Sequence, residues 1–540
     1  MSFAFGILAL ILALYTFLKL TLINPRRKAT KSNASFWASI PTAGVSRSTY
    51  FPWLCAGLRS ISNTEVNAND GYQKFCKALD SPFAIPNAGA GAIVVLPPSQ
   101  LRSVLSRPET EVEAWRAQLD VLQPRYMIPN QGKGVFTEDD PHPVQFSVVR
   151  RHMMRPEDIR GFAPIVAEEL RAALADCWPS QGAGTDQVEN VPLWDTCSRI
   201  VSRISHRIFL GLPLCRDEKL LEQSRLYADA MYGGAAVITT LPKFIRPMIG
   251  PLVALPSRRY LAGCNKILVP VVQERLKIGI GGKGDAMPND ALQWIIEESR
   301  RSGSLDAATI TQRLLMLNLV SIFSTTYHLV NCLLDLLHSP SRDSFITGLR
   351  EECDAVSAAH NGHLGTKEAI DQLYRIDSTV RESLRVSSSG IVAIPRTVAH
   401  GSGGLDLGHM VVPEGVRLGA PLRAIHHDPA YYDEPHRFDA FRFSRPFEGP
   451  EGRGRQAAEQ KLSFTPDETF LSWGYGKHGC PGRWFATQTI KQALAHILQT
   501  HEIECIEQRP AKEALLNIMM PPTKTHVNIR RRQPAGAGSF

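Results

Sequence analysis

The chain has 540 residues, 44% of them hydrophobic and 21% charged, a composition that excludes an intrinsically disordered protein and allows a large core. Its formal net charge is +8, but the basic residues are spread along the chain; this argues against a nucleic acid partner and fits an anionic membrane surface or an acidic protein. We find no internal repeat and no long Gly/Ser-rich linker, so one large domain is admissible.

Ten cysteines are scattered along the chain without a CxxC pair, at positions 55, 76, 177, 197, 215, 264, 332, 353, 480 and 505. This spacing does not resemble a disulfide scaffold and predicts a reducing compartment. A zinc site made of paired cysteines is also unsupported.

The amino terminus reads as a membrane anchor, which we assign to residues 1–24. Phe3 to Ile23 is almost wholly apolar, about the length that a helix needs to cross a bilayer, and only Lys19 within it is charged. The basic residues 26–28 follow directly, which predicts a cytosolic orientation for the remainder. The alternative is a cleaved secretory signal, but no positive charge precedes the apolar run and no A-x-A-like cleavage site follows it. Residues 25–59 are expected to be an irregular linker.

The main domain, residues 60–540, is predicted to be mainly α with a small β part. Apolar runs such as Ala92 to Leu96 beside Pro97 indicate a small sheet in the region 60–150. Helical periodicity dominates from about 158 to 385, and β-like, Gly-rich sequence follows from 390 to 416. The stretch 427–470 shows little periodicity before helix resumes at Pro481.

The glycines of Gly279-Ile280-Gly281-Gly282-Lys283-Gly284 satisfy G-x-G-x-x-G, the pattern of a dinucleotide-binding loop. No βαβ unit surrounds them and Pro288 follows closely, so we interpret the segment as a flexible surface loop.

A long helix is predicted from Asp306 to His338, with Ser324, Thr325 and Thr326 in its middle. A second transmembrane helix is the alternative, but polar residues fall on several of its faces, which favours a buried core helix. The hydroxyls can compete for backbone carbonyls and loosen the helix, leaving room for a small ligand.

Further along, Glu382 and Arg385 lie three positions apart on one helix face, a spacing that by itself is common at surfaces.

The segment 473–483, WGYGKHGCPGR, is a glycine-rich loop that leads into an amphipathic helix. Cys480 stands at the helix entrance, where the helix dipole and the unpaired N–H groups are expected to lower the pKa of its thiol. A lone cysteine is more often a small buried side chain, so the neighbouring residues decide. Glycines at 476, 479 and 482 suit close approach of a flat ligand, and Pro481 suits a first helical position.

W-x-x-G-x-x-x-C-x-G resembles the heme-binding signature of the cytochrome P450 family, in the form found in fungal microsomal members. The resemblance implies the family's fold, heme b (iron protoporphyrin IX) as cofactor, and Cys480 as the thiolate ligand of the iron. Residues 435–443, PHRFDAFRF, resemble a second family segment, whose arginine joins a Glu-x-x-Arg pair; Glu382, Arg385 and Arg442 would then form a structural triad. Ala440 stands where the family usually has a proline.

Other positions take their expected roles from the same resemblance. Thr325 matches the threonine of the family's acid–threonine pair, and Ser324 replaces the acid, so proton delivery would differ in detail. Gly476, His478, Arg396 and Arg150 match heme-binding positions, the basic ones contacting propionates. Lys477, His478, Arg483 and Lys491 are expected to form a positive patch on which an acidic flavin domain could dock.

The function predicted from these resemblances is a membrane-anchored monooxygenase that inserts one oxygen atom from O2 into a hydrophobic small molecule, in fungal secondary metabolism. Electrons would come from NADPH through NADPH-cytochrome P450 reductase, and the catalytic domain would face the cytosol from the endoplasmic reticulum membrane. One alternative is oxidative rearrangement, desaturation or coupling without net hydroxylation. A remote one, kept open by the unusual Trp473, Ser324 and Ile322, is a non-catalytic heme-binding or scaffold protein at the membrane. Substrate contacts are expected near Trp115 to Met127, Ser387 to Val392 and Leu516 to Met520, whose partly apolar character suits a hydrophobic ligand.

Overall fold

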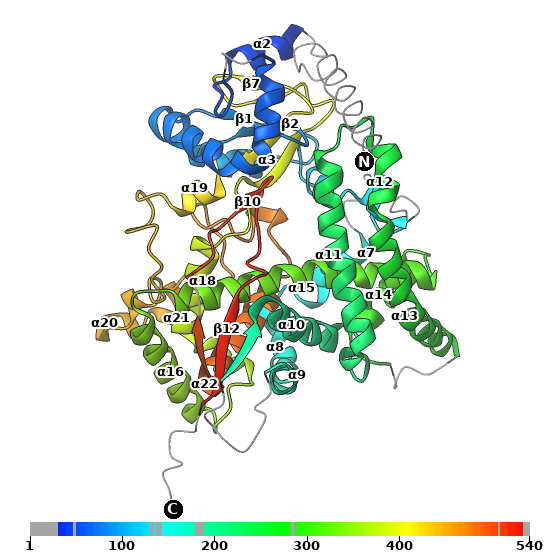
Figure 1. Ribbon diagram of the computed structural model, residues 1–540, viewed down its shortest axis with the longest axis vertical. Helices are drawn as coiled ribbons and strands as arrows, with labels where there is room; N and C mark the ends of the chain where they lie inside the picture. The colour runs from blue at the N-terminus through cyan, green and yellow to red at the C-terminus, as the bar shows by residue number, and fades with distance from the viewer. Residues whose placement is uncertain are drawn as a thin grey trace, which may run out of the picture.

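The computed structural model describes residues 31–46, 50–129, 134–136, 143–178, 188–281, 287–505 and 508–532, and the expected anchor of residues 1–24 lies outside these ranges. The described chain is mainly helical (Figure 1). The longer helices are α2 (Lys31–Ser39), α3 (Pro52–Gly71), α4 (Pro98–Leu105), α5 (Trp115–Leu122), α7 (Val144–His152), α9 (Phe162–Cys177), α10 (Leu193–Phe209), α11 (Glu218–Thr240), α12 (Arg246–Val253), α13 (Leu255–Gly281), α14 (Ala291–Arg301), α15 (Ala307–Leu337), α16 (Arg342–Ala359), α18 (Tyr374–Val386) and α22 (Arg483–Thr500). Shorter ones are α6 (Pro124–Met127), α8 (Pro156–Arg160), α17 (Lys367–Asp371), α19 (Leu422–His426), α20 (Pro450–Arg453) and α21 (Gln456–Glu459).

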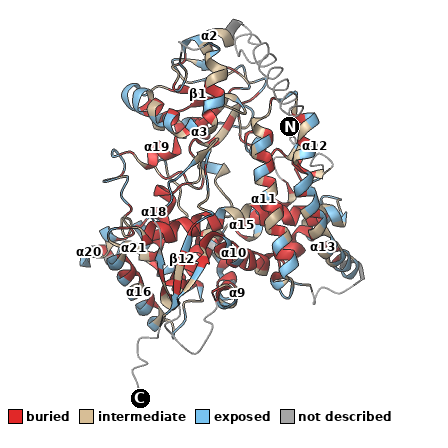
Figure 2. Cartoon of the chain, in the orientation of Figure 1, coloured by how far each residue is buried: buried red, intermediate tan, exposed pale blue. Residues whose placement is uncertain are grey.

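The core is organised around α15. Its N-terminus is capped by the Asp306 carboxylate, which accepts a hydrogen bond from the backbone N–H of Thr309 at 2.7 Å. The helix packs against α10, α11, α13, α18 and α22, and buried residues gather around it (Figure 2). Within the described ranges α15 is the one helix long and apolar enough to cross a membrane, yet 78% of its most apolar window is buried inside the protein. It is therefore the core helix that the sequence favoured.

The β part of the described chain consists of four small sheets. The largest has the strand order β1-β2-β8-β5-β3, and comprises β1 (Phe83–Asn87), β2 (Gly91–Val95), β8 (Arg417–Ala420), β5 (Ala393–Val398) and β3 (Val112–Glu113). The others pair β4 (Glu189–Pro192), β12 (His526–Arg531) and β9 (His501–Cys505), then β6 (Leu405–Asp406) with β7 (Val411–Val412), and β10 (Ala514–Leu515) with β11 (Ile518–Met519). The strand predicted at Ala92 to Leu96 is β2, which pairs antiparallel with β1 and parallel with β8.

The register of β5 against β8 shifts between Ala393 and Arg396. Ile394, inside this irregularity, has φ +57°, a left-handed conformation that is strained for a β-branched residue. Such a bulge re-aims the side chains of a strand, and here Ile394 and Arg396 both end up lining the cavity described below.

Part of the expected linker, residues 25–59, belongs to the folded domain. From Lys31 onward it contains α2 and the start of α3, and Phe36, Ile40 and Ala43 are buried in the core. The N–H of Ala43 donates to the carbonyl of Ala84 at 3.0 Å, which joins this segment to β1. The prediction of an irregular segment was wrong because polar residues separate these apolar side chains, so the sequence does not show the helix, which packs by one face.

The first glycines of the G-x-G-x-x-G segment end α13, and residues 282–286 lie outside the described ranges.

Candidate active site

The loop before α22 holds Cys480 by backbone hydrogen bonds. The N–H of Cys480 donates to the carbonyl of Trp473 at 2.6 Å, and that of Gly479 donates to Gly476 at 3.0 Å. Gly474 and Gly476 have φ of +76° and +67°, conformations that a residue with a side chain adopts only with strain. The Arg483 guanidinium donates to the carbonyl of Cys480 at 2.7 Å, so the loop is tied to the first turn of the helix.

The thiol of Cys480 does not have the lowered pKa that its position predicts. Burial raises its pKa above the ordinary value, and this outweighs the opposing effects of the Gly482 and Arg483 backbone N–H groups and of the Arg483 charge. The lowered pKa was expected from the helix dipole alone, and that expectation omitted the larger effect, the desolvation of the thiolate. A thiol in such a place becomes a stable thiolate when a metal cation binds it directly.

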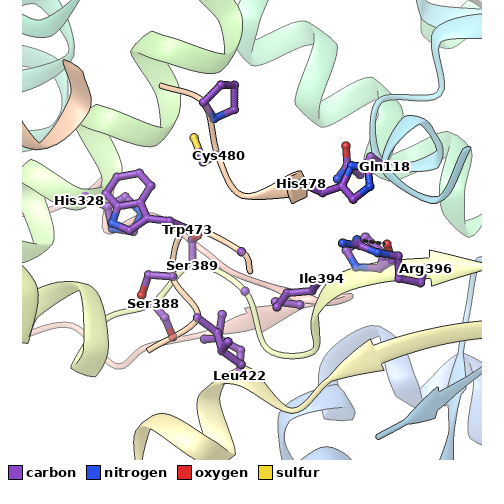
Figure 3. A pocket seen from close by; sticks show the side chains of 17 residues that line it. Gln118, His328, Ser388, Ser389, Ile394, Arg396, Leu422, Trp473, His478 and Cys480 are labelled. Atoms are coloured by element: carbon purple, nitrogen blue, oxygen red, sulfur yellow. Dashed lines mark hydrogen bonds between the residues drawn. The ribbon is translucent and has the colours of Figure 1, made fainter. Parts of the chain in front are cut away.

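Cys480 opens onto a cavity of about 330 Å³, a volume at the lower end of small-molecule sites (Figure 3). Its wall is built from the cysteine loop and the two residues before it, from α5, α15, β5 and α19, and from the segment between α18 and β5. The lining residues are Gln118, His328, Ser388, Ser389, Gly390, Ala393, Ile394, Pro395, Arg396, Leu422, Leu471, Ser472, Trp473, Gly474, His478, Cys480 and Pro481.

One end of the cavity is basic. Arg396 is 2% exposed; its Nη1 donates to the carbonyl of Pro395 at 3.0 Å, whereas its Nη2 has no hydrogen-bond partner among the described residues. Burial lowers the pKa of Arg396 to about 10, although the charge of Glu109 opposes this. Nε2 of His478 lies 2.5 Å from Oε1 of Glu109. Burial alone would raise the pKa of Glu109, but hydrogen bonds from His478 and the N–H of Ala114 bring it below its usual value.

Glu382, Arg385 and Arg442 meet in a buried cluster, the arrangement expected from the sequence. Nε and Nη2 of Arg385 donate to the two oxygens of Glu382 at 2.8 and 2.7 Å, and Nε of Arg442 donates to Oε1 at 3.0 Å. Glu382 and Arg385 have fully buried side chains. Nη1 of Arg385 also donates to the carbonyls of His426 and Pro435, both at 2.6 Å, so the cluster joins α18 to α19 and the segment that precedes the cysteine loop.

The turn of α15 that contains Ser324 and Thr325 differs from the structure that the sequence predicts. Oγ of Ser324 donates to the carbonyl of Val320 at 2.6 Å, and the helix continues without interruption through this turn. The predicted loosening of the helix was therefore wrong, because such a bond is compatible with helical geometry. Thr325 is 4% exposed, and as far as the described residues go the cavity wall includes neither Ser324 nor Thr325. It includes His328, one turn further along, which the sequence did not indicate.

Two of the residues expected to bind heme lie at the protein surface. Gly476 and Arg150 are exposed, Arg150 at the end of α7, and neither is among the described lining residues. The expected positive patch is smaller than predicted. Lys491 is buried and its Nζ lies 3.3 Å from Oδ1 of Asp377, and Arg483 stacks over the ring of Trp484 at 3.5 Å. Lys477 remains exposed.

The three segments expected to contact substrate converge on one region. Gln118 of α5 and the segment Ser388 to Gly390 line the cavity. The N–H of Met519, in β11, donates to the carbonyl of Ser389 at 2.8 Å, and Gly390 forms a bridge with Ile518. The hairpin β10–β11 thus lies directly against the cavity wall.

Comparisons with known proteins agree with the family that the sequence resembles. Residues 98–529 match the family model described as Cytochrome P450. The chain is 36% identical to cytochrome P450 monooxygenase htyF of Aspergillus rugulosus, over 90% of this chain and 71% of the relative. It is 34% identical to cytochrome P450 monooxygenase gloP of Glarea lozoyensis, over 93% and 92%, and 30% identical to okaG of Penicillium ochrochloron, over 89% and 91%.

The chain belongs to the cytochrome P450 family, and it is an oxidoreductase of the monooxygenase type. The family implies a heme cofactor, dioxygen, an organic substrate and a redox partner. The residues present fit a heme. The Cys480 thiol, which a bound metal cation would stabilise as a thiolate, faces the cavity, and a buried guanidinium nitrogen of Arg396 without a partner among the described residues faces it at the basic end, where anionic carboxylates would satisfy it.

Proposed function

We propose that this chain is a heme-thiolate monooxygenase that inserts one oxygen atom from O2 into a hydrophobic small molecule in fungal secondary metabolism. The observation that carries the proposal is one cavity with Cys480 on its wall and the partnerless Nη2 of Arg396 at its basic end. Cys480 would ligate the iron, and Arg396 and His478 would bind the propionates of heme b. When bound, the heme supplies dioxygen activation, which a thiolate ligand favours.

The residues of the chain then have separate tasks. Hydrogen bonds to Trp473 and Arg483 orient the Cys480 backbone, and the Glu382 cluster holds the neighbouring segments in place. The hydroxyls of Thr325 and Ser324 would deliver protons, as the sequence predicts. The proton of Ser324 is engaged by the Val320 carbonyl, so transfer through this hydroxyl requires that bond to break first. Apolar residues such as Leu422 and Ile394 form part of the wall and would exclude water from a hydrophobic substrate.

We further propose that residues 1–24 anchor the chain in the endoplasmic reticulum membrane with the domain in the cytosol, and that an NADPH-dependent cytochrome P450 reductase delivers the electrons. The apolar run and the basic residues after it support the anchor. The exposed Lys477, on the cysteine loop, supports docking of an acidic flavin domain there. Removal of residues 1–24 should release the protein from membranes washed with alkaline carbonate; continued retention would contradict the anchor.

The reduced, carbon monoxide-bound spectrum of the full chain tests the central proposal. The wild type should show the Soret shift typical of thiolate ligation, and Cys480→His should lose it while keeping heme. A well-folded wild type that binds no heme, or a Cys480→His variant with an unchanged spectrum, would overturn the proposal. With the reductase, NADPH and a converted substrate, product mass then separates oxygen insertion from rearrangement or desaturation.

A further inference from the structure

The indole of Trp473 makes a hydrogen bond that phenylalanine, the usual residue at this position of the family signature, cannot make. Its Nε1 donates to the carbonyl of Ser463 at 2.7 Å, and the residue is 7% exposed. An indole N–H is a donor only, and when it is buried it requires an acceptor. The bond therefore ties the start of the cysteine loop to a residue ten positions earlier in the chain.

Ser463 is itself held by a buried carboxylate. Its N–H donates to Oδ2 of Asp377 at 2.7 Å and its hydroxyl donates to Oδ1 at 2.8 Å, and both residues are fully buried. Nζ of Lys491 lies 3.3 Å from the same Oδ1 and supplies the opposite charge. Because Asp377 belongs to α18 and Lys491 to α22, the position of Ser463 is fixed against two helices of the core.

Trp473 joins this network to Cys480. The N–H of Cys480 donates to the carbonyl of Trp473 at 2.6 Å, so one residue accepts from Cys480 through its backbone and donates to Ser463 through its side chain. Trp473 and Cys480 both line the cavity (Figure 3). A continuous series of contacts thus runs from the backbone of Cys480 to the buried pair of Asp377 and Lys491.

We infer that Trp473 is a positioning residue for Cys480, and that it acts through the hydrogen bond of its indole N–H to Ser463. The inference rests on the proposed function, and it gives Asp377 and Lys491 a part in holding the thiolate ligand. With phenylalanine at this position, the carbonyl of Ser463 would lose its indole donor, and packing alone would hold the ring. The carbonyl that accepts from Cys480 would then move more freely, and the bond between sulfur and iron would break more readily.

The rate at which the thiolate ligand is lost tests the inference. The full chain with heme, in detergent, is reduced, saturated with carbon monoxide and placed in urea below the concentration at which far-UV circular dichroism changes. Decay of the thiolate-type Soret band then gives a first-order rate constant. We expect Trp473→Phe to raise this rate constant about fivefold, the effect of one hydrogen bond.

Trp294→Phe is the matched control. Trp294 is 6% exposed and its Nε1 donates to Oδ1 of Asn289 at 2.8 Å, but it belongs to α14 and is not among the described residues of the cavity wall. Its loss should change the rate constant less than about twofold. A rise of less than about twofold for Trp473→Phe, or an equal rise in both variants, would overturn the inference, because an equal rise reports a general loss of stability.

Ser463→Ala extends the test to the network, since it removes the hydroxyl bond to Asp377 and leaves the indole in place. We expect the rate constant to rise about threefold in the wild-type background and less than about 1.5-fold in the Trp473→Phe background, where the route through the indole is absent. Equal factors in both backgrounds would contradict this route. If Trp473→Phe retains no heme, Ser463→Ala decides alone, and an unchanged rate constant overturns the inference. A wild type without the thiolate-type spectrum at the outset refutes the proposed function instead, so the two failures are distinguishable.

Discussion

Replacement of Glu382 by Gln isolates the charge of the buried triad. The carboxylate accepts two hydrogen bonds from Arg385, one from Arg442 and one from the N–H of Asp439 at 3.1 Å. The amide keeps the shape but has a single acceptor oxygen, and its NH2 group faces a guanidinium. Arg385, fully buried, would lose its only carboxylate partner among the described residues. Removing one partner of a buried ion pair typically costs 3–5 kcal/mol, and we expect about that loss here.

Urea denaturation of the full chain in detergent, followed by tryptophan fluorescence, measures this cost, and heme per polypeptide is determined in parallel. Heme content should fall with stability, because the triad ties α18 to α19 and to the segment that precedes the cysteine loop. Arg437→Gln is the matched control: its side chain pairs with Glu434 at 2.8 Å, but 55% of it is exposed, so its loss should change stability by less than about 0.5 kcal/mol. A cost below about 1 kcal/mol for Glu382→Gln, with normal heme content, would refute the reasoning.

Arg396→Leu should reduce heme retention in dialysis against apomyoglobin, because the basic end of the cavity loses its guanidinium; unchanged retention would argue against propionate binding there. Lys491→Met should lower the urea midpoint, since it strands the buried carboxylate of Asp377, whereas exposed Lys477→Glu should leave the midpoint unchanged and slow reductase-driven but not peroxide-driven turnover. Burial raises the pKa of Glu352 in the folded protein to about 7, above the ordinary value near 4.5 that applies in the unfolded chain. The protonated carboxyl therefore stabilises the fold fully below about pH 4.5, and this stabilisation should be lost as the pH rises through 7. Urea midpoints between pH 5 and 8 test this, and Glu352→Gln should flatten the profile; a parallel profile in the variant would contradict it.

Features with a local signature were predictable from the sequence. The cap at Asp306 and the long, mainly apolar stretch after it marked α15. The three-residue spacing of Glu382 and Arg385 places both on one helix face, and the resemblance added Arg442 from 60 positions away. The glycines marked the cysteine loop, since two of them adopt a positive φ there. Pro481 is not the first helical residue that the sequence predicted, because the chain makes one more turn and α22 begins at Arg483.

Features set by tertiary packing were not predictable. α15 is buried on nearly all sides, so no periodicity tells which face meets the cavity, and His328 was missed for that reason. Lys491 seemed a surface charge because its partner, Asp377, comes from α18 rather than from its own helix. The pKa of Cys480 was misjudged in the same way, since desolvation depends on the whole surrounding fold.

The position of β12 at the centre of its sheet has a consequence for biosynthesis. This strand, near the end of the chain, pairs with both β4 and β9, and Asn190 of β4 contacts Asn528 across 338 positions. At ribosomal rates of about 5–20 residues per second, β4 waits roughly 20–70 s for its partner to be made. During that interval its edge is open to other nascent chains. Until translation is nearly finished, the element at hand to cover this edge is α10, which follows β4 directly and packs against it.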